Sequence, residues 1–312
     1  MDKPVLIIMA AGMGSRYGGL KQMGRTQAGI VYWQQNKSMM GMAASSTITT
    51  PSGALAIDMS GMTGTVKTVR PNSNKNTLYI LGANDEMPEG LENSNVVKGG
   101  KAAQISIVDG QGFYTPTTVM AEKVTYTRTF KPGVWETVAL PFAPQQWPAQ
   151  SKVLSFAEES EDGKALFAET DVMERNVPYL VMVASDGEQS FSATDARIAS
   201  SQNSSMIQAT DDYRFIGQTL YTAVQNIFSL NDEGTAFEPV SSLRAAPFRA
   251  YFTTTAEIDK IEVPAGDFSG ITQPFTHHPS STTHHVYDLQ GRCVQHPVRG
   301  LYIQGGKKVV VR

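Results

Sequence analysis

The sequence predicts an all-β protein, with an antiparallel β-sandwich of jelly-roll type followed by a small C-terminal β unit. Short apolar runs bounded by Gly, Pro, Asn and Asp recur from residue 64 onward, a pattern typical of strands and turns. Thr, Ser, Gly and Asn are abundant, whereas windows rich in Leu, Glu and Lys are rare, which favours strands over helices. No helical periodicity separates the runs, so we expect no helix-connected parallel sheet.

The first 63 residues differ from the rest. Residues 1–23 combine the apolar run VLIIM with a Gly-rich turn and a possible helix start. Residues 24–63 are rich in Met, Ser, Thr and Gly without a steady period, so we expect them to be irregular or weakly β. We therefore treat 1–63 as a separate N-terminal segment.

The predicted sandwich spans residues 64–263. Its first strands are GTVKTV, TLYIL and QISIV, and the DGQG that follows QISIV is interpreted as a hairpin turn. VTYTRTF at 124–130 alternates strictly, with Val124, Tyr126 and Phe130 on one face. The KPG turn and VWETVALPF come next, which predicts a hairpin with Trp135 in the core.

Further strand pairs are expected along the chain. KVLSF and ALFAET flank EDGK, and PYLVMV leads through SDGEQ to SFSAT. YRFIGQTL, NIFSL and PFRAYFTTT follow, with Phe248, Ala250 and Phe252 on one face. Strands at this density predict a sandwich or jelly roll.

The C-terminal region divides into a linker and a compact end. Residues 264–285 are rich in Pro, Gly, Ser and Thr, as linkers are. Residues 286–312 contain three predicted strands joined by turns that include Gln-Gly and Gly-Gly. We expect a small separate β unit here.

Composition excludes several functional classes. The formal net charge of the 312 residues is −3, which gives no electrostatic basis for binding nucleic acid. Cys293 is the sole cysteine, so an intrachain disulfide and a Cys-rich metal site are excluded. No apolar run is long enough for a transmembrane segment, and the start MDKPVLIIMAAG is not a convincing signal peptide.

Residues 3–22, KPVLIIMAAGMGSRYGGLKQ, resemble the N-terminal phosphate loop of the sugar-phosphate nucleotidyltransferases. The resemblance implies that Gly12 and Gly14 line the phosphates, that Arg16 and Lys21 contact them, and that Ala10 and Ala11 lie near the base. Gly lets backbone N–H groups approach phosphates, and cations neutralise the leaving pyrophosphate. The family also needs Mg²⁺ held by an Asp, a role open to Asp109, although the turn interpretation is favoured. The amphipathic helix of that family does not follow the loop here.

Residues 76–312 resemble the β-rich C-terminal region of secreted surface proteins of Bacteroidetes. The resemblance rests on TLYILGAND, FYTPTTVMAEKVTYTRTFKPGVWETVALPF, VPYLVMV and PFRAYF. VYDLQGRCVQHPVRGLYIQGGKKVVVR resembles the terminal unit related to type IX secretion sorting domains. The implied roles are structural support, export and surface retention, with secretion machinery or cell-surface components as partners.

A few side chains invite functional hypotheses. Two histidine pairs, His277–His278 and His284–His285, could bind a transition metal, but a solvated linker is the favoured interpretation. Trp147 could form a platform for a glycan, and a loop anchor is favoured. The acidic turns TDD, NDEG and EDGK could ligate Ca²⁺, with solvated turns as the default. Cys293 lacks the setting of a catalytic thiol.

The sequence therefore predicts a non-catalytic, secreted or cell-surface β protein without a cofactor, in which a structural or adhesive module carries a C-terminal sorting element. Two alternatives remain open. One is a nucleotidyltransferase that joins a nucleoside triphosphate and a sugar phosphate with Mg²⁺. The other is a carbohydrate-binding module.

Overall fold

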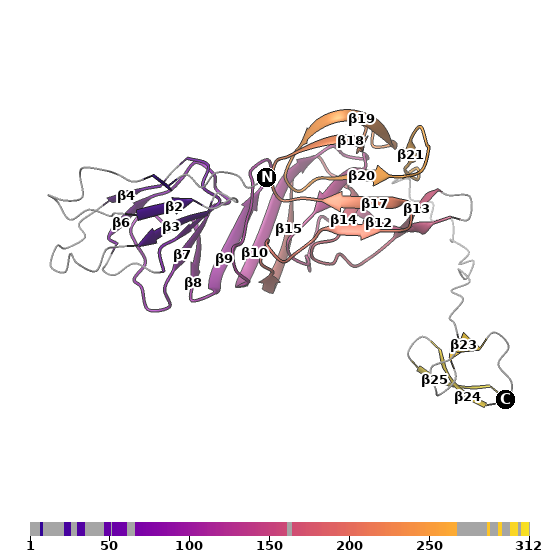
Figure 1. The fold of residues 1–312 in the computed structure, drawn as a ribbon, viewed down its shortest axis with the longest axis horizontal. Coiled ribbons are helices and arrows are strands. Elements are labelled where there is room, and N and C mark those ends of the chain that lie inside the picture. Colours follow the sequence, from indigo (N-terminus) through magenta and orange to yellow (C-terminus); the bar gives the residue numbers. More distant parts are fainter. Residues whose placement is uncertain are drawn as a thin grey trace. The chain divides into compact units, whose positions relative to one another are not determined.

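The structure is a computed structural model in which residues 47–50, 52–60, 66–160 and 164–266 are described. Strand backbone is also described at 7–8, 22–25, 30–34, 286–287, 293–294, 300–304 and 307–311. The chain divides into two compact units, Met1–Phe268 and Ser269–Arg312. Every regular element within these residues is a strand (Figure 1), so the predicted all-β class is confirmed.

The described residues between 47 and 98 form a β-solenoid, and we call them the solenoid region. The chain alternates between two sheets, so that β4 pairs in parallel with β6, and β5, β7 and β8 pair in parallel in order. Thr47, Thr68 and Glu89 align at successive turns of the coil. The strands are β4 (Thr47–Thr49), β5 (Ala56–Asp58), β6 (Thr68–Arg70), β7 (Leu78–Leu81) and β8 (Asn95–Lys98).

The solenoid region departs from the expected antiparallel jelly roll. Parallel strands need a long crossover, which is commonly a helix. Within the described residues, the β5–β7 crossover contains the strand β6, and the β7–β8 crossover contains turns and Glu89, which bridges to Thr68. The two sheets enclose an apolar core. Its buried residues are Ala54, Ile57, Met59, Val69, Tyr79, Leu81 and Leu91. A coil of this kind carries no helical periodicity, which is why the sequence pattern did not reveal the parallel pairing.

One nine-stranded sheet continues from the N-terminal strands through the solenoid to the main body. Its order is β1-β2-β3-β5-β7-β8-β9-β10-β15. Residues 24–63, expected to be irregular or weakly β, contain β3 and β5, which pair with each other. The remaining strands of this sheet are β1 (Ile7–Ile8), β2 (Gln22–Arg25), β3 (Ile30–Gln34), β9 (Lys101–Val108), β10 (Val119–Phe130) and β15 (Gly187–Ile198).

A four-stranded sheet, of order β11-β14-β12-β13, packs on the β9–β10–β15 part of the large sheet. The alternation predicted for β10 is confirmed, since Val124, Tyr126 and Phe130 are buried in this interface. Its strands are β11 (Glu136–Ala139), β12 (Lys152–Glu159), β13 (Ala165–Glu169) and β14 (Pro178–Met182).

A six-stranded sheet, of order β16-β17-β20-β18-β19-β21, covers the other face of the four-stranded sheet. Val153 and Val181 pack in the first interface, whereas Leu154, Leu180 and Met182 pack in the second. The body therefore has three layers of curled sheets, and PYLVM is apolar throughout because β14 is buried on both faces. The strands are β16 (Ile207–Ala209), β17 (Tyr213–Gly217), β18 (Thr222–Leu230), β19 (Ala236–Ala245), β20 (Ala250–Thr254) and β21 (Ile261–Glu262).

Three predicted strand pairs are wrong. β9 and β10, on either side of DGQG, pair in parallel. β10 and β11, on either side of KPG, belong to different sheets, and so do β14 and β15, on either side of SDGEQ. In each case the turn was recognised, with positive φ at Gly110, Gly133 and Gly187, but turn chemistry does not say which strand is the partner. The hairpin of β12 and β13 around EDGK is confirmed.

The unit Ser269–Arg312 holds a small antiparallel sheet of order β23-β22-β24-β25. Three strands were expected, and the described residues of this unit contain four. Gln304 pairs with Lys307, so the Gly-Gly pair joins β24 to β25 as predicted. Most of the expected linker 264–285 lies outside the described residues. The strands are β22 (Val286–Tyr287), β23 (Cys293–Val294), β24 (Gly300–Gln304) and β25 (Lys307–Val311).

Candidate functional site

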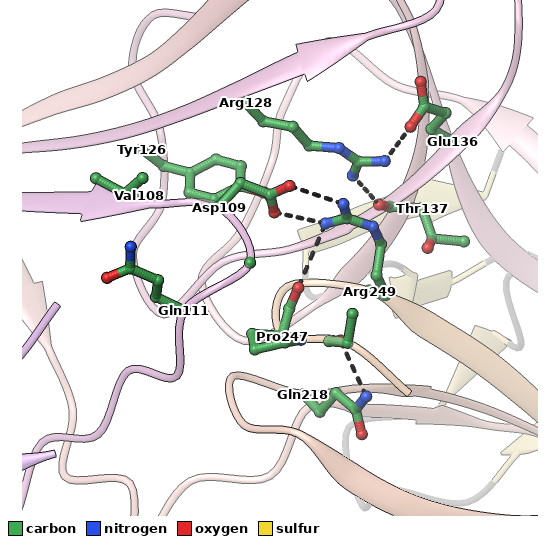
Figure 2. A network of polar contacts seen from close by, with 12 residues as sticks. Val108, Asp109, Gln111, Tyr126, Arg128, Glu136, Thr137, Gln218, Pro247 and Arg249 are labelled. Carbon is green, nitrogen blue, oxygen red and sulfur yellow. Dashed lines mark hydrogen bonds and ion pairs between the residues drawn. The ribbon is translucent and has the colours of Figure 1, made fainter. Parts of the chain in front are cut away.

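A polar network lies inside the main body, where the large sheet meets the other two (Figure 2). The Arg249 guanidinium donates two hydrogen bonds to the Asp109 carboxylate, at 2.7 Å to Oδ1 and 2.8 Å to Oδ2. The Tyr126 hydroxyl donates to Asp109 Oδ1 at 2.7 Å. The side chains of Arg249 and Asp109 are 28% and 24% exposed, so the pair is partly screened by solvent.

The network joins segments that are 140 residues apart in the chain. Asp109 directly follows β9, and Arg249 directly precedes β20. Phe248, beside Arg249, has φ of +62°. Its N–H donates to the Gln218 carbonyl at 2.6 Å, and its carbonyl accepts from the Ala139 N–H at 3.2 Å. These bonds hold the left-handed backbone in place and direct Arg249 towards Asp109.

A second arginine lies beside the first. Arg128 Nη1 donates to the Thr137 carbonyl at 2.8 Å, and Nη2 pairs with the Glu136 carboxylate. The guanidinium carbon lies 4.4 Å from the centre of the Phe130 ring, which adds a cation–π interaction. Arg128 Nε is buried without a hydrogen-bond partner among the described residues. Arg128 thereby connects β10 to β11 across two sheets.

The protonation states fit a structural ion pair. Burial opposes ionisation of Asp109, but the hydrogen bonds and charge of Arg249 outweigh it and lower the Asp109 pKa. Burial raises the pKa of the Tyr126 phenol, so this group stays a neutral donor. Asp109 is thus a permanent anion near neutral pH with both oxygens engaged. It is poorly suited to act as a proton acceptor or a Mg²⁺ ligand, and its role is to hold Arg249 rather than to serve the DGQG backbone.

A cavity of about 290 Å³ opens beside this network, lined in part by Arg128, Glu136, Asp232, Arg244 and Arg249. Arg128 is paired with Glu136, and the Arg244 guanidinium lies over the Tyr221 ring at 4.3 Å. The arginines that line this cavity are therefore engaged, Arg128 and Arg249 by carboxylates and Arg244 by an aromatic ring. We interpret the cavity as a gap between the layers.

Most residues singled out from the sequence are not placed. Ala10, Ala11, Gly12, Gly14, Arg16 and Lys21 lie outside the described residues, and so do His277, His278, His284 and His285. Cys293 begins β23. Within the described residues, no group of three or more His, Cys, Asp or Glu side chains is arranged to hold a metal ion.

The tryptophans are placed. Trp135 is buried, as predicted, and its indole N–H donates to the Pro264 carbonyl at 2.9 Å. Trp147 is half-buried and packs on the first interface. This position matches the favoured interpretation of Trp147 as a loop anchor.

Sequence reasoning missed a set of buried asparagines. Asn76 is fully buried; its amide donates to the carbonyls of Val108 and Gln111 at 2.9 and 2.7 Å, and its oxygen accepts from the Val108 N–H at 2.7 Å. Asn95 pairs with the Ser106 backbone in the same way, at 2.9 and 2.7 Å. These two amides extend the hydrogen bonding from the solenoid to β9. The alternating asparagines of PNSNKN, directly before a buried strand, were the available signal.

Comparison with protein-family models, with curated proteins and with solved structures found no match to this chain. Among the described residues, no helix is long and apolar enough to cross a membrane. The functional conclusions therefore rest on the chain's own residues.

Proposed function

We propose that this protein is a secreted or cell-surface structural and adhesive module, and that residues 286–312 direct its export. The observation that carries the proposal is the nine-stranded sheet, which reaches from the solenoid region into the layered body. The two parts are joined by the backbone pair Lys98–Lys101 and by the buried amides of Asn76 and Asn95. Hydrogen bonds of this kind make the sheet a support that spans both parts. This architecture suits a protein that presents a surface at a distance from its attachment.

The polar network inside the body supports a structural role. Asp109, Tyr126 and Arg249 satisfy one another across the layers, and Arg128 is held by Glu136 and a backbone carbonyl. Groups tied into such pairs stabilise one arrangement of the layers and are costly to release. The C-terminal unit, Ser269–Arg312, is compact by itself and includes residues 286–312, whose sequence resembles a sorting domain.

Deletion of residues 286–312 in a native host tests the proposal. We expect surface delivery, measured by protease accessibility on intact cells, to be abolished. The full-length variant Arg214→Ala, which removes an exposed charge from β17, serves as the control and should be delivered normally. A thermal unfolding transition retained by the deleted chain establishes that the body still folds. Unchanged delivery of that folded, deleted chain would refute the proposal.

The nucleotidyltransferase alternative rests on the sequence of residues 3–22 alone. It requires saturable binding of a nucleoside triphosphate with Mg²⁺, and Arg16→Ala should abolish that binding because the guanidinium would contact the phosphates. Such a result would overturn the structural proposal. No binding by the wild-type chain would remove the alternative.

A further inference from the structure

A second cavity, of about 410 Å³, lies at the end of the body where β10 begins and β15 ends. Its volume falls within the range of small-molecule sites. Arginine, asparagine and hydroxyl side chains line it, among them Arg175, Asn176, Arg197, Asn203 and Ser205. None of the described residues that line it is acidic or aromatic. Its chemistry is therefore that of a site for a polar anion.

The two arginines are available to a ligand. Both side chains belong to exposed residues, and neither makes an ion pair or hydrogen bond with any residue that the structure describes. Arg128 and Arg249, in contrast, form ion pairs with Glu136 and Asp109. A guanidinium presents a planar set of donors that matches carboxylate and sulfate oxygens. Two free guanidinium groups at one cavity thus favour an anionic ligand.

The loops around the cavity are fixed by hydrogen bonds. The Ser200 hydroxyl donates to the Pro116 carbonyl at 2.9 Å, and the Ser204 hydroxyl donates to the Ser200 carbonyl at 2.8 Å. On the opposite loop, the Asn176 N–H donates to the Leu140 carbonyl at 2.8 Å. Three segments are thereby held in place before a ligand arrives. Preorganisation of this kind lowers the entropic cost of binding.

We infer that this cavity binds an acidic saccharide unit, one that carries a carboxylate or a sulfate. Arg175 and Arg197 bind the acidic group, while Asn203, Ser205 and Thr118 offer amide and hydroxyl groups to the sugar hydroxyls. The lack of an aromatic ring in the described lining disfavours neutral sugars, which depend more on stacking. The inference rests on the adhesive part of the proposed function and names the ligand class for it.

Isothermal titration calorimetry of the full chain tests the inference with four probes. These are a sulfated heparin hexasaccharide, a galacturonic acid hexasaccharide, neutral maltohexaose and inorganic sulfate. We expect at least one acidic oligosaccharide to bind, and binding to weaken as salt is raised. The double variant Arg175→Ala/Arg197→Ala should bind at least about tenfold more weakly, whereas Arg214→Ala should bind as the wild type does.

Asn203→Ala separates saccharide recognition from charge alone, since it should weaken oligosaccharide binding and leave inorganic sulfate unaffected. Several results would overturn the inference: no binding of either acidic oligosaccharide, equal binding of maltohexaose, equal binding of inorganic sulfate, or unaltered binding by the double arginine variant. Purified protein is used throughout. A negative result therefore leaves the surface-delivery test, and with it the export proposal, untouched.

Discussion

The solenoid region and the layered body share one sheet but are stabilised in different ways. The core between the two solenoid sheets is made largely of aliphatic side chains, with Tyr79 as its one aromatic member among the described residues. Ala56, Leu78, Ile80 and Val97, also from the solenoid strands, belong instead to the hydrophobic cluster of the layered body. The interface between the four- and six-stranded sheets is dense in aromatic rings, with Phe215 stacked on Phe252 at 4.4 Å. A solenoid depends on contacts between neighbouring turns, whereas a layered core unfolds as a unit. A destabilising substitution should therefore affect only neighbouring turns in the solenoid region, whereas in the layered body it should affect the whole core.

Phe252→Ala should have the largest effect. Phe252 is fully buried, and its ring contacts those of Phe156, Phe215 and Phe237. Removing a buried aromatic ring leaves a cavity and costs about 3–5 kcal/mol in the free energy of unfolding. Urea denaturation followed by tryptophan fluorescence measures the change. Met87→Ala, at a side chain that is 55% exposed, is the control and should cost less than about 0.5 kcal/mol.

Asp109→Asn should have the second-largest effect. It should lower the free energy of unfolding by about 3 kcal/mol, because it leaves Arg249 without its counter-charge. The value lies at the low end for buried pairs, since both side chains are about a quarter exposed. In a double-mutant cycle, Arg249→Met should cost far less in the Asp109→Asn background than in the wild type. Additive costs would mean that the two side chains do not interact.

The same pair predicts a dependence on pH. The pKa of Asp109 is lowered in the folded state, mainly because Arg249 outweighs the effect of burial. The contribution of ionised Asp109 to the free energy of unfolding is therefore complete above its pKa in the unfolded chain, about 4. This contribution is lost as the pH falls through the lower pKa that Asp109 has in the folded protein. Urea midpoints measured between pH 6 and pH 2 should fall less steeply for Asp109→Asn than for the wild type. Parallel curves would contradict this assignment.

Asn76→Ala should cost about 2 kcal/mol, because it leaves the buried backbone groups of Val108 and Gln111 without partners. Asn93, an exposed residue of the same region, provides the matched control, and Asn93→Ala should be nearly neutral. Thermal unfolding followed by circular dichroism measures both variants. Equal melting temperatures would show that Asn76 is dispensable.

Gly90→Ala tests the close packing of turns in the solenoid. Gly90 has φ of +92°, and an added Cβ would lie 2.2 Å from the Val69 carbonyl oxygen. Gly53, also in the solenoid, has φ of +75° but nothing within 4 Å of the added atom. Both variants place an alanine in a left-handed backbone conformation, so this strain is common to the two. The close contact exists only at Gly90, so Gly90→Ala should lower the free energy of unfolding by about 1–2 kcal/mol more than Gly53→Ala does. Equal unfolding midpoints would refute close packing at Gly90.

The positions of individual strands could be predicted from the sequence. Which strands pair with each other, and which distant side chains meet, could not. The positions of β7 and β9 follow from short apolar runs bounded by turn residues, and those of β10 and β20 follow from side chains that alternate within a few residues. The assignment of β10 and β11 to different sheets depends on contacts far along the chain. The same limit applies to Asp109, whose role is set by Arg249, 140 residues away. A sequence such as DGQG predicts a turn. It does not predict which distant side chain contacts the aspartate in that turn.

Native-state hydrogen exchange on the wild type and on Asn76→Ala/Asn95→Ala tests most directly whether the two regions share a sheet yet are stabilised in different ways. Both asparagines join the solenoid to β9. We expect amide protection to fall in β5, β7, β8 and at Ser106 and Val108, while β17 and β20 keep wild-type protection. A uniform loss across all of these strands, or no loss in any of them, would contradict the account.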